Sequence, residues 1–173
     1  LNTPYEISVF PWVRAQKLVE KGHYDAFFVA SKNPDRDQYA VISEPLFDSS
    51  WIWYLPKTST IDPLSKEFFK GSSVGTVFGT SMNAWLKRDF VYVVQKQGSD
   101  ELFQLLSVAR LDAILLTKPM FENSIKRLGK SAKDYKSVVA KKRPLGVYFG
   151  KVLALKKPDF IARFNQGLRV CSS

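Results

Sequence analysis

The sequence has very few of the residues that bind metals or form disulfides. Its 173 residues include a single cysteine, Cys171, and a single histidine, His23. An internal disulfide is therefore excluded. One cysteine and one histidine also cannot supply the ligand set of a zinc site. His23 lacks the pattern of acid and nucleophile that a catalytic triad needs, and Cys171 has no evident base. We therefore expect no metal, no cofactor and no catalytic residue.

Long apolar runs and targeting segments are missing as well. No apolar run approaches the length of a membrane span. The chain opens with Leu1-Asn2-Thr3-Pro4 instead of Met and a basic segment, so we expect a processed or trimmed chain. The glycine-containing stretch 75–81 lacks the Gly-Lys-Ser/Thr of a phosphate-binding loop. Nucleotide binding through such a loop is excluded.

Acidic residues are scarce relative to basic ones. Lys and Arg number 26 against 16 Asp and Glu, which gives a net charge of +10. The densest basic run is Lys141-Lys142-Arg143, and it is not interleaved with aromatic residues as a single-strand-binding surface would be. Hydrophobic residues make up 45% of the chain and aromatic residues 14%, which is typical of a folded core. We therefore expect a solvated basic surface and no nucleic-acid partner.

Apolar patterns of period two alternate with patterns of helical spacing along the chain. The predicted strands cover residues 5–10, 25–29, 39–43, 51–55, 74–78, 90–94, 111–116, 135–139, 146–149 and 152–155. The predicted helices begin near residues 12, 82, 99, 119 and 159, with Ser99 as an N-cap, and residues 30–38 form a loop. This alternation predicts an α/β fold with a largely parallel sheet.

The order of these elements also predicts two lobes. Residues 74–139 form a compact unit of alternating strands and helices, flanked by proline-containing extended segments at 51–56 and 144–149. We therefore expect a second lobe, residues 55–143, to be inserted into a first lobe made of residues 1–54 and 144–173. The chain would cross between the lobes twice.

Four stretches in this order carry a resemblance to a known family. They are Gly22-His23-Tyr24-Asp25-Ala26 with Pro34-Asp35-Arg36 and Ser43-Glu44-Pro45-Leu46, then 74–81 (VGTVFGTS), 106–113 ending in Leu111-Asp112-Ala113, and 164–168 (FNQGL). Together they resemble the solute-binding proteins with the type II periplasmic-binding-protein fold. The resemblance is to the amino-acid-binding branch, called family 3.

The resemblance implies a fold, a location and partners. It implies two α/β lobes joined by two hinge crossings, with a ligand held between the lobes and bound by hinge closure. It also implies a periplasmic monomer that serves the membrane permease subunits of an ABC transporter or a sensor. The family has a further strand and helix before the first matching segment. The first lobe is thus expected to be incomplete at its N-terminus.

In the first lobe, the resemblance places the ligand's carboxylate on Arg36. A guanidinium suits this role because its planar fork donates two parallel hydrogen bonds to a carboxylate. Ala30 and Ser31 would line the same wall. The alternative is that Arg36 is a solvated loop residue paired with Asp35 or Asp37.

In the second lobe, Thr80 and Ser81 follow Gly79 at a predicted helix N-terminus, where free N–H groups attract anions. Plain N-capping by these hydroxyls is the alternative. Thr117 falls where amino-acid-binding members of the family carry an acidic residue for the ligand's ammonium. A threonine cannot supply that charge. The resemblance therefore favours an anionic ligand without an essential ammonium.

Aromatic side chains are expected to form apolar walls. Trp12 is a candidate because ligands of α/β proteins gather at the carboxyl ends of strands. Phe78 is a second candidate in the inserted lobe. For Trp51, Trp53 and Tyr148 we expect packing in the core or at the hinge.

The sequence thus predicts binding of a small anionic or carboxylate-bearing solute for ABC-type uptake or sensing. One alternative is an amino-acid-binding protein proper. Others are an effector-sensing domain of a transcription regulator and an enzyme on the same fold. A helix-turn-helix encoded upstream would favour the regulator, and a signal peptide would favour the periplasmic binder.

Overall fold

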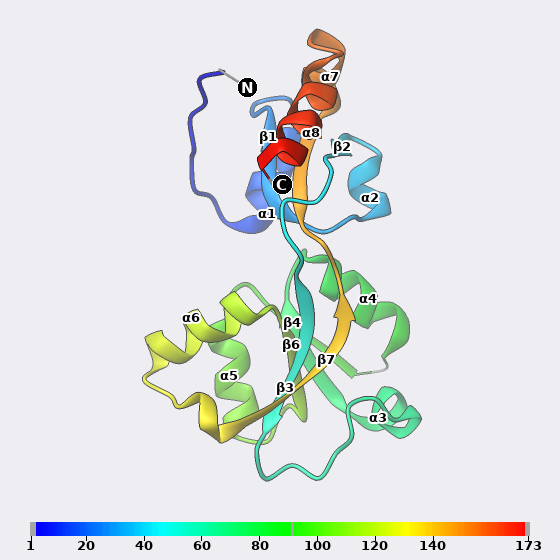
Figure 1. Ribbon diagram of the computed structural model, residues 1–173. Helices are drawn as coiled ribbons and strands as arrows, with labels where there is room; N and C mark the ends of the chain where they lie inside the picture. The colour runs from blue at the N-terminus through cyan, green and yellow to red at the C-terminus, as the bar shows by residue number, and fades with distance from the viewer. Residues whose placement is uncertain (1–2, 91, 172–173) are drawn as a thin grey trace. The chain divides into compact units, whose positions relative to one another are not determined.

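The computed structural model describes residues 3–90 and 92–171. The chain divides into two compact units (Figure 1). Unit 1 consists of Leu1–Asp48 and Pro144–Ser173, and unit 2 of Ser49–Arg143. The first crossing thus lies after residue 48, six residues before the predicted boundary. The reason is that β3 (Ser50–Pro56) pairs along its whole length with β7 (Tyr135–Lys142) in unit 2.

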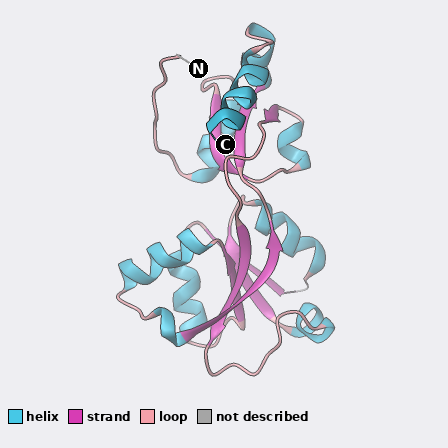
Figure 2. Ribbon diagram, viewed as in Figure 1, coloured by secondary structure: helices cyan, strands magenta, loops and turns pink. Residues whose placement is uncertain are grey.

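Both units contain helices and strands, which alternate along most of the chain, although the last two helices of unit 1 follow one another directly (Figure 2). Unit 1 contains α1 (Trp12–Glu20), β1 (Ala26–Ala30), α2 (Pro34–Asp37), β2 (Ala40–Ile42), β8 (Gly146–Gly150), α7 (Lys151–Lys156) and α8 (Phe160–Cys171). Unit 2 contains β3, α3 (Lys66–Gly71), β4 (Ser73–Val77), α4 (Ser81–Asp89), β5 (Tyr92–Lys96), α5 (Ser99–Ser107), β6 (Ala113–Leu116), α6 (Lys118–Leu128), a 3-10 turn η1 (Ala132–Asp134) and β7.

Unit 1 is built on a three-stranded sheet in the order β1-β8-β2. Both pairings are antiparallel, with Phe27 opposite Tyr148 and Val41 opposite Phe149. Because side chains alternate along a strand, neighbouring residues of β8 supply different cores. Tyr148 packs with Val19, Phe27, Ala30 and Ala40 beside α1. Phe149 packs on the other face with residues of α7 and α8.

Unit 2 is built on a five-stranded mixed sheet in the order β5-β4-β6-β3-β7. β4 pairs in parallel with β5 and β6, whereas β3 is antiparallel to β6 and β7. The expected parallel arrangement therefore holds for β5, β4 and β6 only. Since β3 runs against β6, it begins at the edge where β4 and β6 end, and β7 finishes at that same edge. The chain thus enters and leaves unit 2 at the carboxyl edge of β4 and β6.

The residues of β3 alternate between the two cores of unit 2, as the pattern of the sequence predicted. Trp51, Trp53 and Leu55 are buried beside α3 and α4, where Trp53 meets the ring of Phe68 edge-on. Tyr54 lies on the other face and stacks on Phe121 of α6 at 3.8 Å between ring centroids. The core-packing expectation for both tryptophans is therefore confirmed.

Four local predictions were wrong. Residues 5–10 are not a strand, because they pair with no strand of the unit 1 sheet and leave Tyr5, Ile7 and Val9 exposed. Residues 152–155 belong to helix α7, which begins directly after β8. The loop 30–38 contains the short helix α2. Gly98, not Ser99, is the N-cap of α5, and the Ser99 hydroxyl instead lies 2.6 Å from that of Ser124.

No helix in the described ranges is long and apolar enough to span a membrane.

Candidate functional site

Arg36 lies in the interior of unit 1, and only 3% of its surface is exposed. Its Nε donates a 2.8 Å hydrogen bond to Gln16 Oε1 of α1, and its Nη1 donates a 3.1 Å bond to the carbonyl of Ser31. Both acceptors are neutral oxygens. The guanidinium is thus held in a defined orientation by groups from two different segments.

Three aromatic rings surround the same guanidinium. Its carbon lies 5.3 Å from the ring centre of Trp12, 5.9 Å from that of Phe27 and 6.0 Å from that of Tyr148. Phe27 and Tyr148 are stacked at 5.3 Å, and Trp12 meets Phe27 edge-on. Cation–π attraction strengthens when the partners are shielded from water. We call these four residues, with Gln16 and Ser31, the Arg36 wall.

The short helix α2 brings Arg36 to this position. Asn33 caps it by accepting a 2.8 Å bond from the N–H of Asp35, and Pro34 occupies the first turn, where its fixed φ suits a helix. The Tyr148 hydroxyl accepts a 2.8 Å bond from the N–H of Asn33 and donates one of 2.8 Å to Asp37 Oδ1. β8 thereby fastens both ends of the helix.

The electrostatics of the wall follow from burial. Burial lowers the pKa of Arg36, while Tyr39, Tyr148 and the carboxylates of Asp35 and Asp37 act in the opposite direction. Burial also raises the pKa of the Tyr148 hydroxyl. The hydroxyl therefore stays protonated at neutral pH and can keep donating to Asp37.

The strand before the wall carries a backbone distortion. Val29 has a φ of +63°, which is rare for a β-branched residue, and the register of β1 shifts between Phe28 and Ala30. Such a conformation costs about 1–3 kcal/mol and is retained only where the surroundings enforce it. Ala30 and Ser31 follow directly, and both are buried.

Four of the residues predicted for the first lobe, Trp12, Ala30, Ser31 and Arg36, therefore gather around one point of unit 1. The alternative reading of Arg36 as a solvated loop residue is wrong, because the side chain is buried and donates hydrogen bonds to Gln16 and Ser31. Tyr148, expected to be a packing residue, is part of the wall. Sequence reasoning missed Gln16, although its helical spacing of four from Trp12 places both on one face of α1.

In unit 2, Thr80 and Ser81 open helix α4 after Gly79, whose φ is +72°. Thr80 Oγ1 accepts a 3.2 Å bond from the N–H of Asn83 and donates one of 2.8 Å to the carbonyl of Val77. This hydroxyl therefore acts as an N-cap, the alternative that the sequence left open. Contact of Thr80 or Ser81 with a ligand stays a prediction.

Phe78 and Thr117 lie at the same edge of unit 2, because each follows the end of one of the paired parallel strands β4 and β6. Phe78 is 38% exposed. Thr117 is the N-cap residue of α6 but makes no capping bond with its side chain. The Thr117 hydroxyl therefore does not cap α6, whereas the Thr80 hydroxyl caps α4.

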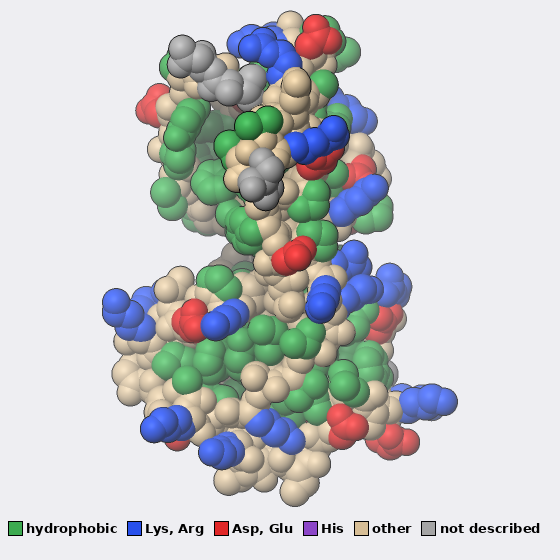
Figure 3. All heavy atoms as spheres, viewed as in Figure 1, with side chains coloured by type: hydrophobic (Ala, Val, Ile, Leu, Met, Phe, Trp, Pro, Cys, Tyr) green, Lys and Arg blue, Asp and Glu red, His purple; other side chains and the backbone are tan. Residues whose placement is uncertain are grey.

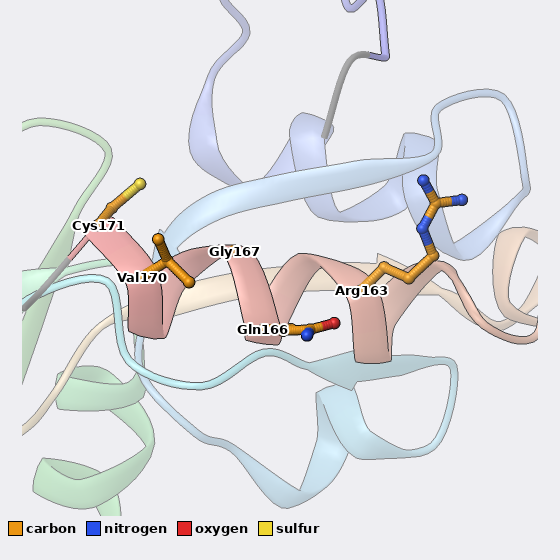
Figure 4. A pocket seen from close by; sticks show the side chains of 5 residues that line it. All are labelled: Arg163, Gln166, Gly167, Val170 and Cys171. Atoms are coloured by element: carbon orange, nitrogen blue, oxygen red, sulfur yellow. The ribbon is translucent and has the colours of Figure 1, made fainter.

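Within the described residues, one hollow and the distribution of possible metal ligands bear on the sites predicted from the sequence. A shallow hollow of about 390 Å³ lies along α8 and is lined by Arg163, Gln166, Gly167, Val170 and Cys171 (Figure 4). None of these residues belongs to the sites predicted from the sequence. Within residues 3–90 and 92–171, no group of three His, Cys, Asp or Glu side chains could hold a metal ion.

The sequence matches no protein-family model and no curated protein. Solved structures do match. Ligand-bound (holo) ArgBP from T. maritima has a TM-score of 0.79 and 19% identity over 100% of this chain and 75% of that chain. The ancestral amino acid-binding protein AncCDT-1, a precursor of cyclohexadienyl dehydratase, has a TM-score of 0.74 and 19% identity over 96% and 71%. The substrate binding protein of an amino acid ABC transporter has a TM-score of 0.73 and 17% identity over 95% and 72%.

At these identities, the likeness shows the fold. The chain has the type II periplasmic-binding-protein fold, which confirms the fold class expected from the four sequence stretches.

Proposed function

We propose that this chain is a solute-binding protein. Its ligand is an amino acid whose carboxylate is held at the Arg36 wall. The observation that carries the proposal is the fixed guanidinium, oriented by Gln16 and Ser31 and surrounded by Trp12, Phe27 and Tyr148. A group whose orientation is set before binding loses little entropy when a ligand arrives. The fixed fork suits bidentate recognition of a carboxylate.

An amino acid is better supported than the anionic ligand favoured by the sequence. By their own descriptions, the three structures compared above are ArgBP, an ancestral amino acid-binding protein and the substrate binding protein of an amino acid ABC transporter. ArgBP is also described in an arginine-bound form. Thr117 lacks a charge, but an ammonium also donates hydrogen bonds to neutral oxygens such as hydroxyls and carbonyls. The missing acid at this position therefore does not exclude an amino acid.

Isothermal calorimetry on the purified chain tests the proposal. The probes are L-arginine, L-glutamine and the other proteinogenic amino acids, each with its analogue lacking the α-amino group. We expect at least one amino acid to bind more tightly than its analogue. Tighter binding of an analogue would instead favour the anionic solute, and no binding of any probe would contradict both ligand classes.

Substitution at the wall provides the matched comparison. Arg36→Lys keeps the charge but loses the planar fork, so we expect it to weaken binding by on the order of 10-fold or more. Because Arg36 also packs the interior of unit 1, circular dichroism must show that the variant is folded. Arg110→Lys makes the same change at an exposed position of unit 2 and serves as the control. Equal affinity of a folded Arg36→Lys chain and the unmodified chain would refute the clamp.

The proposal includes a periplasmic location and delivery to an ABC-type permease or a sensor, with binding rather than turnover. One neighbour of the same fold is described as a precursor of an enzyme, cyclohexadienyl dehydratase. Recovery of the bound ligand unchanged, analysed by mass spectrometry after incubation, distinguishes binding from catalysis. A signal peptide encoded upstream supports the periplasmic binder, whereas an encoded helix-turn-helix supports an effector-sensing domain.

A further inference from the structure

The positive charge of the chain is concentrated in unit 2. Residues 49–143 contain sixteen Lys and Arg against eight Asp and Glu, whereas the rest of the chain has ten against eight. Unit 2 therefore carries +8 of the net +10. Figure 3 shows Lys and Arg side chains outnumbering Asp and Glu on the visible face of this unit. The proposed ligand site does not account for this asymmetry.

Several of these cations lie at the amino edge of β4 and β6, where α5 and α6 end. We define the basic edge as Lys57, Arg110, Lys126, Lys130 and Lys133. Lys130 Nζ donates a 3.1 Å bond to Ser107 Oγ, which places the end of α6 beside the end of α5. The N–H of Lys57 bonds to the carbonyl of Asp134 at 2.8 Å, which brings Lys57 next to η1 and Lys133.

Ion pairs do not neutralise this edge. In unit 2, the salt bridges of the described residues use Arg88, Lys96, Lys118 and Arg127, none of which belongs to the basic edge. Asp112 and Asp134 lie at the same edge, but neither takes part in the salt bridges of the described residues in unit 2. Asp112 Oδ2 instead accepts bonds from the N–H and hydroxyl of Ser73. Lys57, Arg110, Lys126 and Lys133 are exposed, and Lys130 is half-buried.

An exposed apolar side chain, that of Val108, lies beside the cations of the basic edge. Val108 is 64% exposed in the turn between α5 and β6, two residues from Arg110 and next to Ser107, the partner of Lys130. Ala109 beside it has a φ of +53°, a left-handed conformation in a sharply bent turn. An exposed aliphatic side chain among lysines is suited to the boundary between lipid headgroups and acyl chains.

We propose that the basic edge docks unit 2 on a membrane surface rich in anionic phospholipid. Four of its five cations are lysines, and the defined edge contains no aromatic residue on which a nucleic-acid base could stack. Lysines on flexible stems gain from a diffuse anionic surface without needing matched partner geometry. Val108 adds contact with the acyl boundary.

Vesicle co-sedimentation of the purified chain tests this docking. We expect binding to vesicles of phosphatidylglycerol and phosphatidylcholine and none to pure phosphatidylcholine. The binding should weaken steeply when salt rises from 50 to 500 mM, because screening shortens the range of the attraction. Equal binding to both vesicle types would overturn the proposal.

Replacing lysines in either unit tests whether the basic edge is the surface that binds the vesicles. K126Q/K130Q/K133Q should lower the partition coefficient by about 5-fold per residue, on the order of 100-fold in total. The control K21Q/K156Q/K157Q removes the same charge from exposed positions of unit 1. An equal loss in both triple variants would mean that net charge, not this edge, drives binding, and the proposal would fail.

Competition separates the lipid surface from other anions. Inorganic phosphate at millimolar concentration should displace the chain no more than chloride of equal ionic strength. Specific displacement by phosphate would instead indicate a discrete anion site. Tighter binding of single-stranded DNA than of anionic vesicles would overturn the choice of lipid.

Discussion

The hydroxyl of Tyr148 donates a 2.8 Å hydrogen bond to Asp37 Oδ1, and so joins strand β8 to the last residue of helix α2. The two residues are 111 positions apart in the chain. The same hydroxyl accepts a bond from the N–H of Asn33 at the start of the helix. Arg36 lies between these two attachments. The orientation of the proposed carboxylate clamp therefore depends on a strand contributed by the C-terminal part of the chain.

Tyr148→Phe should destabilise unit 1 while leaving the aromatic stack intact. The substitution removes the acceptor of the Asn33 N–H and the donor to Asp37, and buried groups left without partners cost about 1–3 kcal/mol. Urea unfolding followed by fluorescence measures the change. The exposed Tyr92→Phe is the matched control and should change stability by less than about 0.5 kcal/mol. An equal effect in both variants would show that the Tyr148 hydroxyl does not hold α2.

Two substitutions of Trp53 should separate the contribution of its ring packing to stability from the cost of its buried indole N–H. Its side chain is fully buried, and its indole N–H has no hydrogen-bond partner among the described residues. Trp53→Ala should cost about 3–5 kcal/mol because it opens a cavity against Phe68 and Phe90. Trp53→Phe should cost clearly less, since it removes the unpartnered donor along with part of the volume. Guanidinium unfolding of both variants provides the comparison, and equal losses would contradict it.

Gly75→Ala should destabilise unit 2 by overpacking. A methyl group at this position would lie 2.6 Å from Leu111 Cδ1 and 2.9 Å from Leu102 Cδ2. Both leucines are buried, so they cannot move aside into solvent, and we expect a loss of about 1–3 kcal/mol. Gly71→Ala, also in unit 2, has open space around the added methyl and should be nearly neutral. Thermal unfolding of the two variants decides, and a neutral Gly75→Ala would mean that the leucines repack.

Asp100 should add stability at neutral pH that disappears in acid. Hydrogen bonds from Arg127 and Ser124 lower the pKa of this carboxyl below its ordinary 3.8. A carboxyl with a lowered folded-state pKa stabilises the fold above the unfolded-state pKa, and loses this effect as pH falls through the folded one. Asp100→Asn should therefore lower the free energy of unfolding at pH 7, and the two chains should converge at an acidic pH below the folded-state pKa. Urea titrations at both pH values measure this. A difference that persists in acid would assign the effect to hydrogen bonding alone.

Local pattern was informative wherever a segment's own residues decide its structure. The alternation of Trp51, Trp53 and Leu55 predicted β3 and its buried face, and Pro119 marked the first turn of α6. Residues 5–10 show the limit of such patterns. They have the same alternation but remain unpaired, since a strand is stable only where another strand completes its hydrogen bonds.

The candidate site shows the same difference between what local sequence determines and what tertiary contacts decide. The sequence alone determined the α/β class, the two-unit order and the choice of Arg36 as the residue of interest. Only the tertiary structure decided that Arg36 is buried, that Gln16 and Ser31 orient it, and that Tyr148 fastens its helix. Propensity and spacing act over a few neighbouring residues. The Arg36 wall joins segments more than a hundred residues apart. The local sequence pattern does not indicate which distant side chains will meet.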